Sequence, residues 1–391
     1  MPSTATPLFA EPLHVGLPNV GDRVRLMERI NGALDRLWLT NNGPLVREFE
    51  ARIAALTGAR HCVTTCNATT GIQIAAKAAG IRAGDEVIVP SFTWVATAHA
   101  LEWIGIVPVF CDVDEETGTA DVAHVERLIG PNTRGILGVH VFGYPCDIEG
   151  LSALARRYGI PLLFDAAHAL GCTYRGRPIG GFGSAEIFSF HATKFINTFE
   201  GGAIVTNDDE LAERARAMRQ QGLDAEHRVA GPGTVARMNE ICAAMGLTAL
   251  EAMDSLIEVN RRNHGHYEEG LAGVAGVRVR PMAPDEHANY QYVVIEIDAE
   301  VAGVHRDVVN DILLGHNVLS RRYFDPGCHL DEPYRSNTSR HAPLPLPRTE
   351  ALTDRVLSLP TGPAIGPAEI SGICEIIRQA VPAYGPAEAL V

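Results

Sequence analysis

A lysine between two short apolar segments is well placed for covalent chemistry in this chain of 391 residues. Lys194 lies just beyond a β-like run at 186–190 and shortly before a second one at 203–206. A lysine held between buried strands is partly removed from water, and burial lowers the pKa of its amine. The neutral amine is a nucleophile that can form a Schiff base with a carbonyl compound. Most lysines are exposed loop residues, so this interpretation depends on the strands that precede Lys194.

Three upstream strand ends supply groups that a carbonyl cofactor would need. An apolar run ends in Asp165, as a buried parallel strand does when it carries a carboxylate to the edge of its sheet. Another strand-like run leads into Asn67-Ala68-Thr69, where a helix would begin and its free N–H groups would suit a phosphate. A third is followed by Trp94, which offers a flat ring.

Together these features match what pyridoxal 5′-phosphate requires. That cofactor needs a phosphate site, a stacking surface, an anion at its ring nitrogen and a lysine for its aldehyde. Each feature alone has a simpler explanation. Asp165 could cap a helix, Trp94 could belong to the core, and the Asn67 segment could be only a helix N-cap. The order of the four features along one sheet edge favours the cofactor site.

Over nearly its whole length the chain resembles the DegT/DnrJ/EryC1/StrS family of sugar aminotransferases. The resemblance implies the α/β architecture of fold type I aminotransferases, which depend on pyridoxal phosphate. It implies a large, mostly parallel, seven-stranded α/β/α domain and a smaller C-terminal α+β domain. The motifs that carry it are LTNNGP at 39–44, PSFTWVATA at 90–98, HVFG at 140–143, DAAH at 165–168, SFHATK at 189–194 and LSLPTG at 357–362.

The resemblance also implies a role for particular residues. Lys194 would bind the cofactor aldehyde and then move the proton, while Asp165 would pair with the ring nitrogen. His168 would contact the phenolic oxygen, where many relatives have Gln, and the protonation state of its ring would matter. The other implied cofactor contacts are Ser189, Ala68 and Thr69 at the phosphate and Trp94 against the ring.

A second subunit is implied by the segment 233–240, which resembles one that reaches into a neighbour's active site. Val235 stands where several relatives have Asn, so Arg237 is the better candidate for a phosphate contact across the interface. A solvated surface arginine is the alternative interpretation. The expected working unit is a homodimer with shared active sites, in which the cofactor becomes pyridoxamine 5′-phosphate during turnover.

Two C-terminal segments, RYFDPGCH at 322–329 and EPYR at 332–335, resemble relatives that make 4-amino-4,6-dideoxyglucose. The predicted reaction moves an amino group from glutamate to C4 of dTDP-4-keto-6-deoxyglucose, a dTDP-sugar, with Tyr323 and His329 on the substrate side. Packing of a loop around Pro326 would explain both residues equally well. Attack at C3 of a 3-keto isomer stays open, because a small change in sugar pose would decide it.

Other activities fit the sequence less well. A related sugar dehydratase has His at the lysine position, whereas this chain keeps Lys194. A sensor that binds cofactor and sugar nucleotide without turnover lacks support, because no basic recognition helix is evident. A nicotinamide enzyme is disfavoured, because no Gly-x-Gly-x-x-Gly follows the first strand.

Length and composition fit a core-rich protein with more than one domain. We expect an N-terminal arm at 1–21, a large cofactor-binding domain at 22–250 and a small domain at 251–391.

The net charge of −14 argues against nucleic acid or an anionic membrane as the partner. No leader-like or membrane-spanning run is evident, so we expect a cytoplasmic protein. The eight cysteines include no Cys-x-x-Cys pair, and no metal site is expected.

Alternating apolar patterns predict the elements of both domains. Seven strands are expected at 62–65, 86–89, 107–111, 135–139, 162–165, 187–190 and 203–206. The other expected elements are helices at 22–38, 210–220, 238–260, 304–314 and 370–381 and an antiparallel strand at 290–297.

Overall fold

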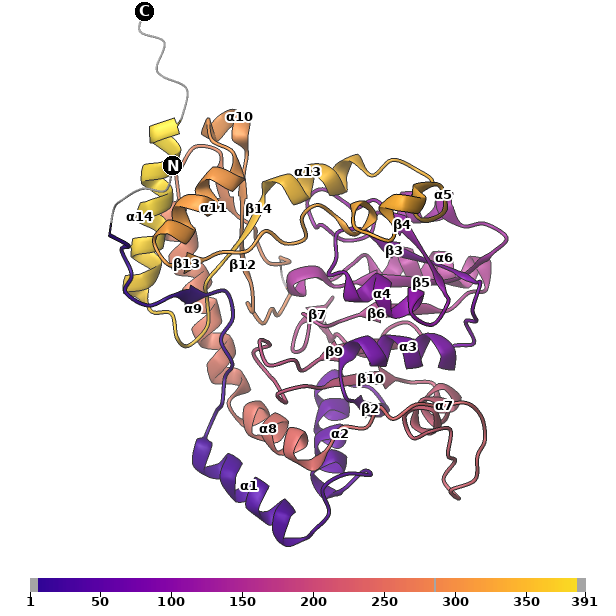
Figure 1. The fold of residues 1–391 in the computed structure, drawn as a ribbon. Helices are drawn as coiled ribbons and strands as arrows, with labels where there is room; N and C mark the ends of the chain where they lie inside the picture. The colour runs from indigo at the N-terminus through magenta and orange to yellow at the C-terminus, as the bar shows by residue number, and fades with distance from the viewer. Residues whose placement is uncertain (1–5, 285, 385–391) are drawn as a thin grey trace, which may run out of the picture.

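The computed structural model describes residues 6–284 and 286–384. A seven-stranded sheet forms the centre of the larger part of the molecule, with the order β2-β10-β9-β6-β5-β3-β4 (Figure 1). β10 runs antiparallel to both of its neighbours, and the other neighbouring pairs are parallel. The strands span His61–Thr65 (β2), Glu86–Pro90 (β3), Val107–Cys111 (β4), Thr133–Val139 (β5), Leu162–Asp165 (β6), Ala185–Ser189 (β9) and Gly202–Thr206 (β10).

These strands are apolar and almost fully buried because helices cover both faces of the sheet. Helices α2, α5, α6 and α8 contribute to the core on one face, and α3, α4 and α7 to the core on the other. The predicted fold class is confirmed. The helices span Arg23–Asp35 (α1), Pro44–Thr57 (α2), Ala68–Ala78 (α3), Ala96–Glu102 (α4), Val122–Leu128 (α5), Ile148–Tyr158 (α6), Asp209–Arg219 (α7) and Glu240–Glu251 (α8).

A second core lies around a three-stranded antiparallel sheet with the order β11-β12-β14, which Figure 1 shows beside α9, α11 and α14. Leu256 near the start of α9 packs in the core of the large sheet, whereas Leu271 at its end packs in the second core. One helix thus joins both cores, and the boundary near residue 250 stays a prediction. The elements span Met253–Leu271 (α9), Val277–Val279 (β11), Val293–Ile297 (β12), Ala299–Ala302 (α10), Arg306–Gly315 (α11), Val356–Leu359 (β14) and Pro367–Tyr384 (α14).

Two expectations about chain organisation differ from the structure. The single helix expected at 238–260 is two helices, because Ala252 adopts φ −98° and ψ 3° between α8 and α9. The predicted N-terminal arm contains a short strand, Leu13–His14 (β1), which pairs in parallel with Val318–Leu319 (β13). Residues 1–5 of that arm and 385–391 of the predicted small domain lie outside the described residues.

Short elements complete the described chain, in which no helix combines the length and apolar character needed to cross a bilayer. The segment that contains Cys328 and Tyr334 packs against β3, α4 and β4 of the large sheet and not within the second core. The short elements are Val141–Gly143 (η1), Thr173–Tyr174 (β7), Arg177–Pro178 (β8), Cys328–Leu330 (η2), Arg335–Asn337 (η3), Thr338–His341 (α12) and Pro347–Arg355 (α13).

A buried glutamate connects two helices that pack on the same face of the large sheet. Gly43 precedes α2 and has no side chain with which to cap it, so the first N–H groups of the helix need another acceptor. The carboxylate of Glu240, at the start of α8, accepts from the N–H groups of Leu45 and Val46 at 2.9 Å each. Glu240 is fully buried, so these hydrogen bonds stabilise the packing of α2 against α8.

We expect Glu240→Ala to lower the free energy of unfolding by about 2–4 kcal/mol, because two buried N–H groups lose a charged acceptor. The shift in the urea-unfolding midpoint of the cofactor-free protein measures this effect. Glu210→Ala is the control, since Glu210 is exposed and its ion pair with Arg214 contributes little. Equal midpoints for the two variants would contradict the role given to Glu240.

Candidate active site

The carboxyl ends of β5, β6 and β9 open onto a cavity of about 380 Å³. Lys194 follows β9, Asp165 ends β6, and the N-terminus of α3 forms another part of the wall. Most of the predicted site residues lie together around this cavity, although they come from separate parts of the chain. They are Ala68, Thr69, Trp94, Asp165, His168, Ser189, Lys194 and Tyr323.

Lys194 is held in the cavity by a hydroxyl group. Its Nζ donates a hydrogen bond to the Oη of Tyr292 at 2.9 Å. Burial lowers the pKa of Lys194 to about 8, against the opposing influence of Tyr323 and Asp165. A substantial fraction of the amine is therefore neutral near pH 8, which makes it a usable nucleophile and base.

Asp165 is buried at the end of β6, where two donors hold its carboxylate. Thr97 Oγ1 donates to Oδ2 at 2.8 Å, and the N–H of Ala167 donates to Oδ1 at 3.0 Å. Burial raises the pKa of Asp165, while these two hydrogen bonds and the nearby Lys194 oppose the rise. A cation bound in the cavity beside Asp165 would favour its ionised form further.

His168 is a neutral hydrogen-bond donor on the same side of the cavity. Burial, reinforced by the charge of Lys194, holds the pKa of His168 well below the usual value for histidine. Its Nδ1 accepts a hydrogen bond from the N–H of Phe142 at 3.1 Å. In the neutral ring the proton is therefore on Nε2, which can donate to an oxygen in the cavity.

The N-terminus of α3 offers free N–H groups to an anion. Asn67 caps the helix by accepting from the N–H of Thr70 at 2.8 Å. The N–H groups of Ala68 and Thr69, in the first turn, have no acceptor within the helix and lie at its positive end. A Cβ on Gly202 would lie 2.6 Å from the nitrogen of Ala68, so only glycine lets β10 start this close to the helix.

Two aromatic residues border the cavity at its open side. Trp94 is 56% exposed, and its ring lies edge to face with that of Tyr323, with ring centroids 6.5 Å apart. Tyr323 also lies 6.0 Å from Tyr292 between centroids. The indole of Trp94 is therefore largely exposed beside the cavity, as expected of a ring that stacks on a ligand.

The structure does not place His329 in this cavity. Its ring is buried, with Nδ1 2.7 Å from Ser91 Oγ and Nε2 3.3 Å from a carboxylate oxygen of Glu350. Its backbone N–H also donates to Ser91 Oγ at 3.0 Å. His329 thus fixes its loop to the end of β3, and its position does not support the substrate contact predicted for it.

Arg237 is half-buried and does not line the cavity of its own chain. The residue before it, Ala236, accepts a hydrogen bond from the N–H of Cys66 at 2.8 Å. This contact places the segment beside the loop that leads into α3. The predicted role of Arg237 concerns a neighbouring subunit and stays a prediction.

Among the residues that line the cavity and that sequence reasoning did not single out are Tyr292 and Arg321. Tyr292 lies in a segment predicted as a strand, where an aromatic residue is ordinarily part of the core. Arg321 stands one residue before the motif at 322–329. Its position next to this motif, which resembles a substrate-binding segment, could have marked Arg321 as a candidate. No local pattern marks Tyr292.

Comparison with known proteins gives consistent matches along the chain. A model of the DegT/DnrJ/EryC1/StrS aminotransferase family matches residues 22–378. GDP-perosamine synthase from Caulobacter vibrioides is 36% identical over 351 residues, which cover 88% of this chain and 92% of the relative. UDP-4-amino-4-deoxy-L-arabinose–oxoglutarate aminotransferase from Shewanella sediminis is 35% identical over 360 residues, with coverage of 88% and 92%. The crystal structure of DesI in the presence of its TDP-sugar product has a TM-score of 0.93 and 50% identity, covering 97% of this chain and 96% of that one.

The amine of Lys194 should react selectively with an aldehyde. The sequence contains only one other lysine, Lys77, which is exposed on α3. We expect pyridoxal 5′-phosphate followed by borohydride to label Lys194, with a rate that rises as pH rises through about 8 and then levels off. Peptide mapping identifies the labelled lysine, and Lys77→Arg is the control that should keep the label. Label confined to Lys77, or a rate at Lys194 that is independent of pH, would contradict the assignment.

Proposed function

Because the chain belongs to the DegT/DnrJ/EryC1/StrS aminotransferase family and is a pyridoxal-phosphate-dependent sugar aminotransferase, we propose that its substrate is dTDP-4-keto-6-deoxyglucose. The amino group would pass from glutamate to C4 and give dTDP-4-amino-4,6-dideoxyglucose. The observation that carries the catalytic part is the meeting of Lys194, Asp165 and His168 in one cavity.

The residues around the cavity fit the cofactor. When bound, pyridoxal 5′-phosphate supplies an aldehyde that condenses with amines and a ring that withdraws electrons. Asp165, a buried carboxylate, would hold a proton on the ring nitrogen, and the Nε2–H of His168 would donate to the phenolic oxygen. Ala68 and Thr69 would bind the phosphate through the free N–H groups of α3, where Gly202 leaves room for the close approach of β10.

Ser189 and Trp94 complete the cofactor contacts in this proposal. Ser189 ends β9 and lines the cavity, where its hydroxyl would donate to the phosphate. Trp94 presents an exposed ring that would stack on the flat cofactor ring.

Lys194 performs the acid–base chemistry in this proposal. Its amine would hold the cofactor through the aldehyde carbon, and it would be free to act as a base once a substrate amine is bound. Lys194 would then accept a proton at Nζ from the substrate carbon and could return it to the reacting carbon of the cofactor. A pKa of about 8 suits both directions, because the amine can accept and return a proton near neutral pH. The hydroxyl of Tyr292 orients the amine through the 2.9 Å hydrogen bond.

The identity of the substrate rests on the relatives and on the residues at the cavity rim. The TDP-sugar product of DesI supports a TDP-linked sugar for this chain. The name of the 4-amino-4-deoxy-L-arabinose relative supports attack at C4 and the use of the glutamate–oxoglutarate pair. Tyr323 lies at the cavity rim, where its ring and hydroxyl would contact the sugar.

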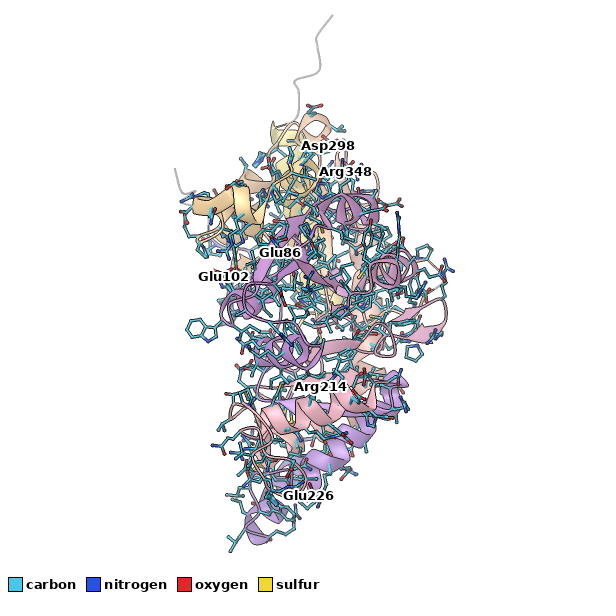
Figure 2. The ribbon with its side chains drawn as sticks, turned by 90° about the vertical axis from the view of Figure 1, so that its right-hand side faces the viewer. Glu86, Glu102, Arg214, Glu226, Asp298 and Arg348 are labelled. Atoms are coloured by element: carbon cyan, nitrogen blue, oxygen red, sulfur yellow. The ribbon has the colours of Figure 1, made fainter. Side chains whose placement is uncertain are left out.

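We also infer a homodimer in which Arg237 reaches the phosphate bound by the partner subunit. The segment that follows α7 projects from the body of the molecule in Figure 1. Glu226 belongs to this segment, and Figure 2 shows it near the lower end of the molecule, away from Glu86 of the central sheet. A projecting segment that ends in a half-buried cation is suited to complete a phosphate site across an interface.

NMR of the product tests the proposed reaction. We expect incubation with pyridoxal 5′-phosphate, glutamate and dTDP-4-keto-6-deoxyglucose to give a product with nitrogen on C4. Lys194→Ala should give no product, because Lys194 is the only lysine among the described residues that line the cavity and could move the proton. An amine at C3, or no turnover with this sugar, would contradict the C4 assignment and leave the aminotransferase class intact.

The role of Arg237 is tested by cofactor affinity. We expect Arg237→Ala to weaken binding of pyridoxal 5′-phosphate about 10-fold or more, the loss of one charge-assisted hydrogen bond. Arg228→Ala is the control, because Arg228 pairs with Asp224 and Glu226 of its own segment. Absorbance titration gives the affinity, and light scattering gives the mass. A fully active monomer would refute the dimer, and unchanged affinity would refute the phosphate contact.

A further inference from the structure

A second, smaller cavity of about 30 Å³ lies directly beside the main one. Tyr292, Tyr323, Thr193 and Arg321 line both cavities, so the two share a wall. The segment 15–19 of the N-terminal arm contributes to the small cavity from the other side. The side chain of Tyr292, which lines the small cavity, accepts a hydrogen bond from the amine of Lys194. The small cavity is therefore close to that amine.

Arg321 brings a positive charge to both cavities. Its backbone is fixed to β14, because its N–H and C=O both bond to Ser358, at 3.0 and 2.8 Å. Its guanidinium donates to the Oη of Tyr323 at 3.3 Å, and it has no acidic partner among residues 6–284 and 286–384. The adjacent Arg322 differs, since it pairs with Asp307 and Asp325.

Two buried polar groups of the small cavity also lack partners. Gln291 is 7% exposed and Thr361 is 5% exposed. The amide oxygen of Gln291 accepts from the N–H of Phe195, but its Nε2 and the Oγ1 of Thr361 have no hydrogen-bond partner in the described part of the chain. Leaving buried donors unpaired is costly, so the two buried groups of Gln291 and Thr361 indicate a ligand with acceptor atoms. The exposed guanidinium of Arg321 lies at the same cavity and favours an anionic ligand.

The N-terminal arm closes this cavity. A Cβ on Gly16 would lie 3.2 Å from the carbonyl oxygen of Thr193, so the arm passes close to the residue before Lys194. Asn19 donates to the carbonyl of Phe195 at 3.1 Å, and its own carbonyl accepts from Asn197 at 2.8 Å. The arm is therefore held to the segment that carries the lysine. Gln291 and Thr361 are buried beneath it, whereas Arg321 is exposed.

We propose that the small cavity binds a carboxylate of the amino donor, with Arg321, Gln291 and Thr361 as its donors. This inference rests on the proposed function for the use of an amino acid at all. The ligand has to be an anion with acceptor oxygens, and both the amino acid and the sugar nucleotide carry such groups. The size of the cavity decides between them, because a space of about 30 Å³ admits a carboxylate but not a nucleoside diphosphate. An arginine also matches the planar geometry of a carboxylate.

The two halves of the reaction separate the two sources of the anion. Glutamate alone converts the bound cofactor to its amino form, and the change in absorbance measures this step without any sugar. We expect Arg321→Gln to raise the half-saturating glutamate concentration by about 10-fold or more, as befits a lost hydrogen bond to a charged group. Thr361→Val, which keeps the shape, should raise it by about threefold. Calorimetry should show weaker binding of 2-oxoglutarate to the Arg321→Gln protein carrying pyridoxamine 5′-phosphate and unchanged binding of dTDP.

Arg322→Gln is the matched control and should leave both ligands unaffected, and equal thermal unfolding temperatures would show that the variants are folded. Weaker dTDP binding with unchanged glutamate saturation would overturn the proposal, because Arg321 would then serve the diphosphate. No change for either ligand would also overturn it, since the cavity would then hold only water. The glutamate step needs no sugar, so a wrong sugar assignment would not affect the outcome.

Discussion

The carboxylate of Asp165 is a charge that the fold keeps almost entirely out of water, and the arrangement of the site depends on it. Burial favours the neutral acid, whereas Thr97, Ala167 and the amine of Lys194 favour the ion. Burial acts in the opposite sense on Lys194, whose pKa falls to about 8. Burial in the same cavity therefore has two effects: the carboxylate of Asp165 needs a cation beside it, and the amine of Lys194 readily loses its proton. A protonated ring nitrogen beside Asp165 would meet the first need.

The sheet brings these groups together because its strands run parallel around β6. Parallel strands end at the same edge, so Asp165 at the end of β6 and the lysine turn beyond β9 meet there. The antiparallel strand β10 then returns from the lysine turn to pair with both β9 and β2. Its first residue, Gly202, has no side chain to hold it away from α3. The N-terminal end of α3 and the lysine turn are thus positioned by one short stretch of chain.

Residues from the C-terminal half of the chain supply the other side of the cavity. Tyr292 precedes β12, and Arg321 and Tyr323 follow β13, so these residues face the large sheet across the cavity. Helix α9 packs in both cores and fixes how they meet. The groups suited to the cofactor thus come from the large sheet, and the cations and hydroxyls suited to a substrate come mainly from the C-terminal half. The N-terminal arm joins the two by pairing with β13 and passing beside Thr193.

The sequence by itself determined the fold class and the residues that stand at strand ends. Lys194, Asp165 and the Ala68–Thr69 turn could be predicted because each follows an apolar run whose period and length mark a buried strand. The observed bounds of most predicted elements differ from the predicted ones by only a few residues, because the same apolar patterns mark where an element begins and ends. The break at Ala252 was missed, because no proline or glycine there interrupts the helical pattern.

Only the tertiary structure decided which distant segments meet. The partner of Lys194, Tyr292, lies 98 residues away along the chain, and no local pattern encodes that contact. The same holds for the capping of α2 by Glu240 and for the pairing of β1 with β13. His329 and Tyr323 belong to one motif, yet Ser91 holds the first in a loop while the second faces the cavity. Local sequence determines where a strand ends and which group stands there, whereas long-range packing determines what that group touches.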